Sequence, residues 1–319
     1  MTSAGVVMAV ALVAAACSSS GGAAKPSATT AGGSKTSGVL ASTATSSDGK
    51  VTVRAVSAPA PYVSGTSLLV EVTWPGKLGA RPTGPVPSVA VDGHPTGIDL
   101  ARQPHIGDGP QGLAIEDVLV HGLHPGGNEV AASLDGSTAT LRVTDHSIQG
   151  PVFSGPRQTP FACTTEGAGL GPSSPPDCAA PTRVTFDYVS TSGAVKPLHL
   201  GPAPADLATG ADGQPDYVLD EKGVIDRSIY EIAVPVVAQS STEMRPADTN
   251  WNGRLVYRYG GGCGTTYSQG SDLAGVLDPH LLVKGYAVAT STLNTFQSAC
   301  NAVLSAEVTM MVKQHFIET

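Results

Sequence analysis

The chain has 319 residues, of which 41% are hydrophobic and 14% are charged, and its formal net charge is -8 at pH 7. A chain of this length and hydrophobic content can build buried cores in about two domains, which excludes a protein that is disordered throughout. The Lys and Arg residues form no dense run, so the sequence predicts no nucleic-acid partner.

The N-terminus is typical of an export signal. An apolar run from Val6 to Ala16 is too short to span a bilayer as a mature helix, and it ends in small residues that Cys17 follows. This segment resembles a bacterial lipoprotein signal, which implies lipidation of Cys17 and anchoring to the outer face of the cell membrane. A secretory signal that is cleaved elsewhere is the alternative. Both alternatives export the protein.

A low-complexity segment from 18 to 49 follows and consists mostly of Ser, Gly, Ala and Thr. It cannot bury enough apolar surface to offset the entropy lost on ordering, so we predict a flexible linker. The predicted organisation is a signal peptide over 1 to 17, this linker, a β-sandwich over 50 to 148 and a second domain over 149 to 319.

Without Cys17, the cysteine count is even, which predicts disulfides in an exported protein. The remaining cysteines allow three pairings. We favour Cys163 with Cys178, which closes a Pro/Gly-rich loop, and Cys263 with Cys300, which ties a glycine turn to a later loop. A catalytic cysteine is the weaker alternative. No Cys-x-x-Cys pair is present, and we predict neither a metal site nor a cofactor.

Short stretches with alternating apolar and polar residues follow the linker. Turn residues such as Pro-Gly, Asp-Gly and Gly-Gly separate them at nearly regular spacing. The predicted strands are 51 to 56, 67 to 74, 87 to 93, 115 to 123, 128 to 134 and 139 to 146. This pattern predicts a β-sandwich of immunoglobulin-like type. His121 and His124 would lie on opposite faces of a strand, so we interpret them as surface residues.

The second half of the chain begins with longer loops and then alternates strand and helix signals. The predicted strands are 182 to 190, 228 to 237, 255 to 259 and 286 to 291, and the predicted helices lie within 271 to 285 and after Asn301. We interpret the acid-rich segment between the first two strands as a solvated loop. The alternation after Trp251 predicts a mostly parallel, doubly wound sheet.

A glycine run interrupts this pattern directly after the strand at 255 to 259. Glycine leaves room for backbone amides to approach a ligand, such as an oxyanion that develops during ester cleavage. An ordinary structural turn is the alternative. A phosphate-binding loop is a poor fit, because Gly-Lys-Ser/Thr is missing.

Three segments carry a family resemblance: WNGRLVYRYGGGCG (251 to 264), LLVKGYAVATSTLN (281 to 294) and NAVLSAEVTMMVKQHFIE (301 to 318). They resemble the tannase and feruloyl-esterase group of α/β-hydrolases. The chain is also similar to an uncharacterised family of secreted, largely actinobacterial proteins related to those esterases and to hydroxybutyrate-oligomer hydrolases. The resemblance implies the N-terminal part of an α/β-hydrolase domain, and an exported serine hydrolase whose substrate is a small-molecule or oligomeric carboxylic ester. Gly261, Gly262 and Cys263 become the candidates for its oxyanion hole.

The catalytic triad implied by this resemblance has no counterpart in the chain. No Ser has Gly at both i-2 and i+2, and Ser268 has Thr266 where such an elbow requires Gly. We therefore expect the nucleophile beyond Thr319, in a longer enzyme of which this chain is an inactive and poorly stable N-terminal part. The alternative is a surface-anchored binding lipoprotein on a hydrolase-like scaffold without catalysis. The oligomeric state does not follow from the sequence.

Overall fold

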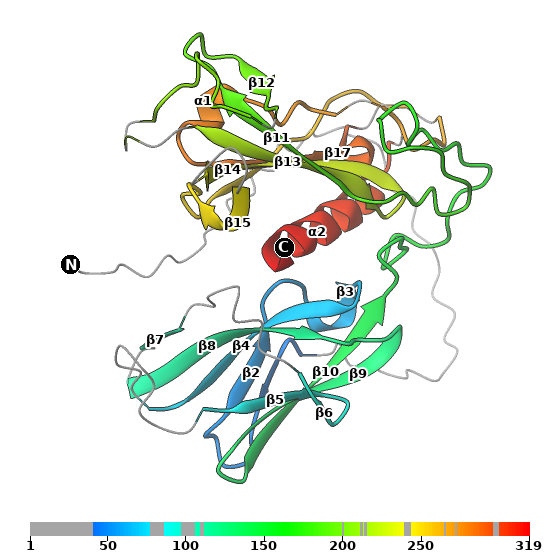
Figure 1. Cartoon of the computed structure of the whole chain (residues 1–319). Coiled ribbons are helices and arrows are strands. Elements are labelled where there is room, and N and C mark those ends of the chain that lie inside the picture. Colours follow the sequence, from blue (N-terminus) through cyan, green and yellow to red (C-terminus); the bar gives the residue numbers. More distant parts are fainter. Residues whose placement is uncertain are drawn as a thin grey trace, which may run out of the picture. The chain divides into compact units, whose positions relative to one another are not determined.

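The structure is a computed structural model, shown in Figure 1. It describes residues 41–76, 86–96, 106–108, 112–199, 201–210, 213, 216–238, 244–264, 266–271, 273–295 and 300–319. Cys17, the predicted signal peptide and most of the predicted linker lie outside these residues.

The first half of the described chain forms two five-stranded sheets. One sheet has the order β1-β2-β4-β8-β7, and the other has the order β3-β10-β9-β5-β6. In the first sheet the strands are β1 (Thr43–Thr45), β2 (Thr52–Ala55), β4 (Ser67–Pro75), β7 (Ile106–Asp108) and β8 (Leu113–His121). In the second they are β3 (Val63–Ser64), β5 (Ser88–Val91), β6 (His94–Pro95), β9 (Gly126–Leu134) and β10 (Ser137–His146).

Both sheets contribute side chains to one apolar core. On β4 every second residue is buried, including Leu68, Val70 and Trp74, and on β10 Leu141 and Val143 are buried in the same way. This period of two is the alternation from which the strands were predicted. Each of the six predicted strands of this half overlaps an observed strand.

A third sheet follows, with the order β12-β11-β13-β14-β17-β16, and β15 pairs with β14 (Figure 1). Its strands are β11 (Arg183–Val189), β12 (Val195–Pro197), β13 (Tyr217–Ile225), β14 (Ser228–Ala238), β15 (Met244–Thr249), β16 (Leu255–Tyr257) and β17 (Ala287–Ser291). Within this sheet β16 and β17 are the parallel pair, and the other described pairs are antiparallel.

The prediction of an α/β-hydrolase domain with a mostly parallel sheet was therefore wrong. Asp226 and Arg227 alone connect β13 to β14, and such a short connection permits only antiparallel pairing. The segment 271 to 285 forms only one helical turn, α1 (Pro279–Leu282). In the described part of the chain α1 and α2 (Ala302–Glu318) are the only α-helices, so the sheet is not flanked by the helices that a doubly wound fold requires.

The acid-rich segment contains β13, so the prediction of a solvated loop was wrong there. Asp220 is only 7% exposed, and Glu221 accepts a hydrogen bond from the Tyr230 hydroxyl at 2.6 Å. Carboxylates at strand positions hid the apolar pattern that a buried strand normally shows.

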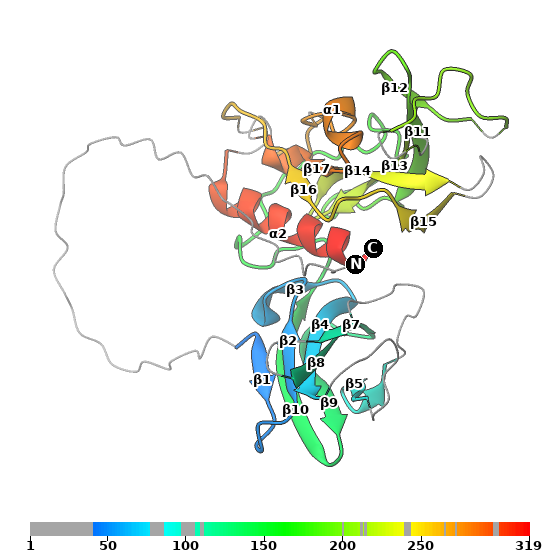
Figure 2. The same ribbon diagram turned by 90° about the vertical axis from the view of Figure 1, so that its left-hand side faces the viewer.

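Asn301 directly precedes helix α2. Its side chain caps the helix by accepting from the amides of Val303 and Leu304. Figure 2 shows α2 along one face of the third sheet, where Val308 and Met311 pack in a shared core. Glu307 and Gln314 on the same helix are fully buried. Apolar periodicity alone would place Glu307 on the solvated face of this helix, whereas the structure buries it.

Candidate functional site

The glycine loop (residues 260–264) leaves the third sheet at the end of β16. Because β16 runs parallel to β17, the segments that follow these two strands lie at the same edge of the sheet. The Gly260 amide donates to the carbonyl of Asn294 at 3.2 Å. A Cβ on Gly260 would lie 2.9 Å from the Cβ of Thr295, so only glycine fits this contact.

A disulfide fastens the other end of the glycine loop. Cys263 is bonded to Cys300, with their Cα atoms 4.8 Å apart, and the Cys300 amide donates to the carbonyl of Gly264 at 2.8 Å. This is the pairing that the sequence predicted. Cys300 precedes the cap of α2, so the positive end of the helix dipole is near the loop.

Between these two attachments the loop carries three neighbouring backbone donors. Gly261, Gly262 and Cys263 are exposed, and their amides have no hydrogen-bond acceptor among the residues that the structure describes. Gly262 has a φ of 91°, which favours glycine, and a Cβ on Gly261 would meet nothing within 4 Å. Within the described residues, three exposed amides thus lie together on a loop that is held at both ends.

Asn294 supports the loop from inside the protein. Its side chain is fully buried, its Oδ1 accepts from the Tyr257 hydroxyl at 2.6 Å and from Ser291 Oγ at 2.5 Å, and its Nδ2 donates to the Ser305 carbonyl at 2.7 Å. Burial raises the pKa of Tyr257, which keeps its hydroxyl protonated as the donor. Asn294 was not predicted from the sequence, although a polar residue three positions after the end of β17 was an available signal.

A pocket of about 420 Å³ is lined by Glu231, Arg258 and residues 275–279. Arg258 forms an ion pair with Asp278 at 2.9 Å and donates to the carbonyl of Gly275, so it holds one wall of the pocket in place. Arg258 lies just before Gly260 in the chain. The pocket and the glycine loop thus begin from the same strand end.

The described residues do not assemble a Ser-His-acid triad at the glycine loop. Ser268 Oγ is 3.0 Å from the Thr266 hydroxyl, and the His280 amide donates to Asp278 at the start of α1. The ring of His315 contacts Glu221 at 2.6 Å. In this part of the chain no serine hydroxyl contacts a histidine ring, so the loop supplies donors without a described nucleophile.

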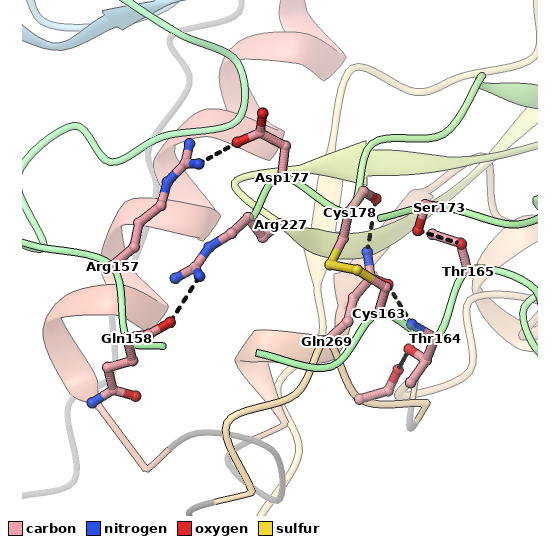
Figure 3. Close-up of a disulfide and its surroundings, with 11 residues drawn as sticks. Arg157, Gln158, Cys163, Thr164, Thr165, Ser173, Asp177, Cys178, Arg227 and Gln269 are labelled. Carbon is pink, nitrogen blue, oxygen red and sulfur yellow. Dashed lines mark hydrogen bonds and ion pairs between the residues drawn. A yellow bond between two sulfur atoms is a disulfide. The ribbon is translucent and has the colours of Figure 1, made fainter. Parts of the chain in front are cut away.

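The second disulfide joins Cys163 to Cys178, again as predicted, and lies beside a buried glutamine (Figure 3). Gln269 donates from Nε2 to the Cys178 carbonyl at 3.3 Å and accepts from the Thr164 amide at 2.8 Å. These bonds attach the disulfide loop to the segment after the glycine loop. The presence of two disulfides is consistent with an extracellular protein.

Membrane-spanning helices and metal-binding clusters are both absent from the residues that the structure describes. None of their helices has the length and apolar character needed to cross a membrane. Within the same ranges, no group of three or more His, Cys, Asp or Glu residues is arranged to hold a metal ion.

Comparison with known proteins gives one result. A family profile described as "Tannase-like family of unknown function (DUF6351)" matches residues 53–319. No curated protein and no solved structure matches the chain. The family match includes the glycine loop, both disulfides and all three sheets from β2 onward. The chain therefore belongs to this tannase-like family of unknown function.

Proposed function

We propose that the protein hydrolyses carboxylic esters and that the amides of the glycine loop bind the oxyanion formed in the reaction. Membership in a tannase-like family supports ester chemistry. The observation that carries the proposal is the set of amides at Gly261, Gly262 and Cys263, which are exposed and have no described acceptor on a loop fastened at both ends. Donors that are fixed before the reaction stabilise developing charge without reorganisation.

The chemistry assigns the loop one part of a two-step reaction. A serine oxygen attacks the ester carbonyl carbon, the carbonyl electron pair moves to oxygen, and a histidine accepts the serine proton. The amides of the glycine loop donate to that oxyanion. Collapse expels the alcohol, which takes the proton from histidine, and water then releases the acid from the acyl-enzyme. The serine and histidine of this proposal lie outside the described residues.

A binding function without turnover is the second candidate. It is favoured by one observation, which is that no serine hydroxyl contacts a histidine ring in the described ranges. In that case the same amides would bind an ester carbonyl or a carboxylate, and the protein would serve as a surface-anchored receptor for such ligands.

Replacing Gly261 with proline tests the assignment, because it removes one amide donor, whereas alanine keeps that donor and occupies open space. In the purified protein, G261P is expected to lower kcat for p-nitrophenyl esters about 100-fold, while G261A stays within about threefold of the parent. Equal kcat values for all three proteins would reject the loop as the oxyanion site. Ester binding without any hydrolysis by the parent would support the receptor instead.

Export and lipid anchoring at Cys17 form part of the same proposal. They rest on the apolar run before Cys17 and on the two disulfides. Cys17→Ser is expected to abolish incorporation of an alkynyl palmitate label in the native host, since serine offers no thiol, while Ser18→Ala keeps the label. Undiminished labelling of the Cys17→Ser protein would contradict the anchor.

A further inference from the structure

A cluster of buried charges lies away from the glycine loop, where the connector (residues 147–158) between β10 and β11 meets the β13–β14 turn and α2. The turn residues Asp226 and Arg227 have φ angles of 50° and 59°. Asn-Gly or Asp-Gly normally fills such a turn, because side chains are disfavoured at positive φ. Both side chains of this turn are charged residues, and both are buried.

Glu307 brings the connector to α2. It is fully buried and accepts three hydrogen bonds, from the amides of Phe153 and Ser154 and from Ser154 Oγ at 2.7 Å. The Asp226 carboxyl lies close to Glu307, and its buried Oδ2 has no hydrogen-bond partner among the described residues. A buried carboxyl group that lacks a donor and lies beside another carboxyl group is costly to ionise, so Asp226 holds a proton in the closed form.

The neighbouring charges support the same assignment. Arg227 faces the cluster from the turn, and Arg157 faces it from the connector and forms an ion pair with Asp177. With Asp226 protonated, the two arginines balance the negative charges of Glu307 and Asp177. Figure 3 shows Arg157 pointing toward Asp177 and Arg227 directed at the carbonyl of Gln158. Ionised Asp226 would add an uncompensated buried charge, which is costly.

The contact between the connector and Asp226 is direct. The Asp226 amide donates to the carbonyl of Ile148 at 2.9 Å, and Arg157 donates to the carbonyls of Gln149 and Gly150. Asp226 is 2% exposed. Burial first, and then the negative charge of Glu307, raise the pKa of Asp226 to about 8.

We propose that the Asp226–Glu307 pair is a proton-dependent latch, which holds the connector against the turn and α2 and releases it as the pH rises. The sign follows from proton linkage. An opened connector leaves Asp226 in water with an ordinary acidic pKa, so the closed form binds one proton more than the open form between about pH 4 and about pH 8. Within this interval each pH unit shifts the equilibrium toward the open form. The inference is independent of the proposed ester chemistry.

Trypsin cleavage after Arg157 reports opening, because the protease must take a guanidinium group that the closed connector keeps bonded to Asp177 and to two carbonyls. We would measure the rate at which Gln158 becomes a new N-terminus, in the parent chain and in D226N. Asparagine at 226 has nearly the same shape as aspartic acid and carries no titrating proton. The ratio of the two rates cancels the pH dependence of the protease.

The ratio of the cleavage rate of the parent to that of D226N is expected to rise at least about tenfold from about pH 6 to about pH 8. D220N is the matched control, since burial likewise raises the pKa of Asp220, to about 7, on the same sheet. The ratio of the cleavage rate of D220N to that of the parent is expected to stay constant across that interval, because Asp220 has no described contact with the connector.

E307Q provides a second variant, because glutamine keeps an acceptor oxygen and removes the charge that opposes ionised Asp226. The parent-to-E307Q ratio is expected to rise with pH at least about threefold over the same interval. A constant ratio for the folded D226N protein overturns the latch. If D226N does not fold, a constant ratio for E307Q overturns it.

Discussion

Replacing Gly150 with alanine is expected to lower the free energy of unfolding by about 4 kcal/mol. Gly150 has a φ of 64°, and a Cβ there would lie 2.0 Å from Oδ1 and 2.9 Å from Cγ of Asp226. Asp226 is short and buried, and its amide is bonded to the carbonyl of Ile148, so its side chain has little room to move aside. Urea denaturation of the two proteins at one pH measures the difference.

Gly155 in the same connector provides the control for this prediction. It also has a positive φ, 89°, but a Cβ at this position would meet nothing within 4 Å. Gly155→Ala therefore tests backbone strain alone, and its expected cost is about 1 kcal/mol. If both alanine variants lose the same stability, the tight contact between the connector and Asp226 is wrong.

Replacing Gln314 with alanine is expected to cost about 4 kcal/mol of unfolding free energy, because it leaves buried backbone groups without partners and opens a cavity. Gln314 Oε1 accepts from the amide and the hydroxyl of Ser64 at 3.0 and 2.9 Å, and its Nε2 donates to the Ser64 carbonyl at 2.9 Å. Ser64 belongs to β3, far from α2 in the sequence. Gln314 thus fastens α2 to a strand of the second sheet.

Tryptophan fluorescence during urea denaturation can measure this loss, since Trp74 lies in the core shared by the first two sheets and Trp251 makes a T-shaped ring contact with Phe316 of α2. Lys313→Ala on the same helix is the control, and its expected cost is within about 0.5 kcal/mol. Its side chain is only partly buried. A loss below about 1 kcal/mol for Gln314→Ala would show that the Ser64 contacts contribute little.

Both variants test contacts that local sequence patterns do not reveal. Gly150 looks like one more glycine before a proline, and Gln314 looks like one more polar residue on an amphipathic helix. Each becomes critical only because another segment lies against it: the β13–β14 turn in the first case and β3 in the second. Helical periodicity accounts for Val308 and Met311 as core residues, but it does not account for the burial of Glu307, because it counts only apolar faces.

The strands and helices that define the fold class also differ in whether local sequence patterns predict them. Alternation predicted β4 and β10 because one face of each strand is apolar, and the Asn301 cap marked the start of α2. Alternation did not predict β13, because Asp220 on that strand is buried beside other charged side chains of the sheet. Without β13, the antiparallel hairpin with β14 was missed, and the later strand and helix signals suggested a parallel sheet.

The sequence by itself determined the strands that have one polar and one apolar face and the cap of α2, since these depend on local spacing. Among three possible cysteine pairings it favoured the observed one without determining it. Tertiary structure alone decided the direction of the strands, the burial of Glu307 and Gln314, and the attachment of the glycine loop at both ends. These features depend on hydrogen bonds between distant segments. Such bonds satisfy polar groups that would otherwise favour solvent, so the side chains involved carry no apolar signal.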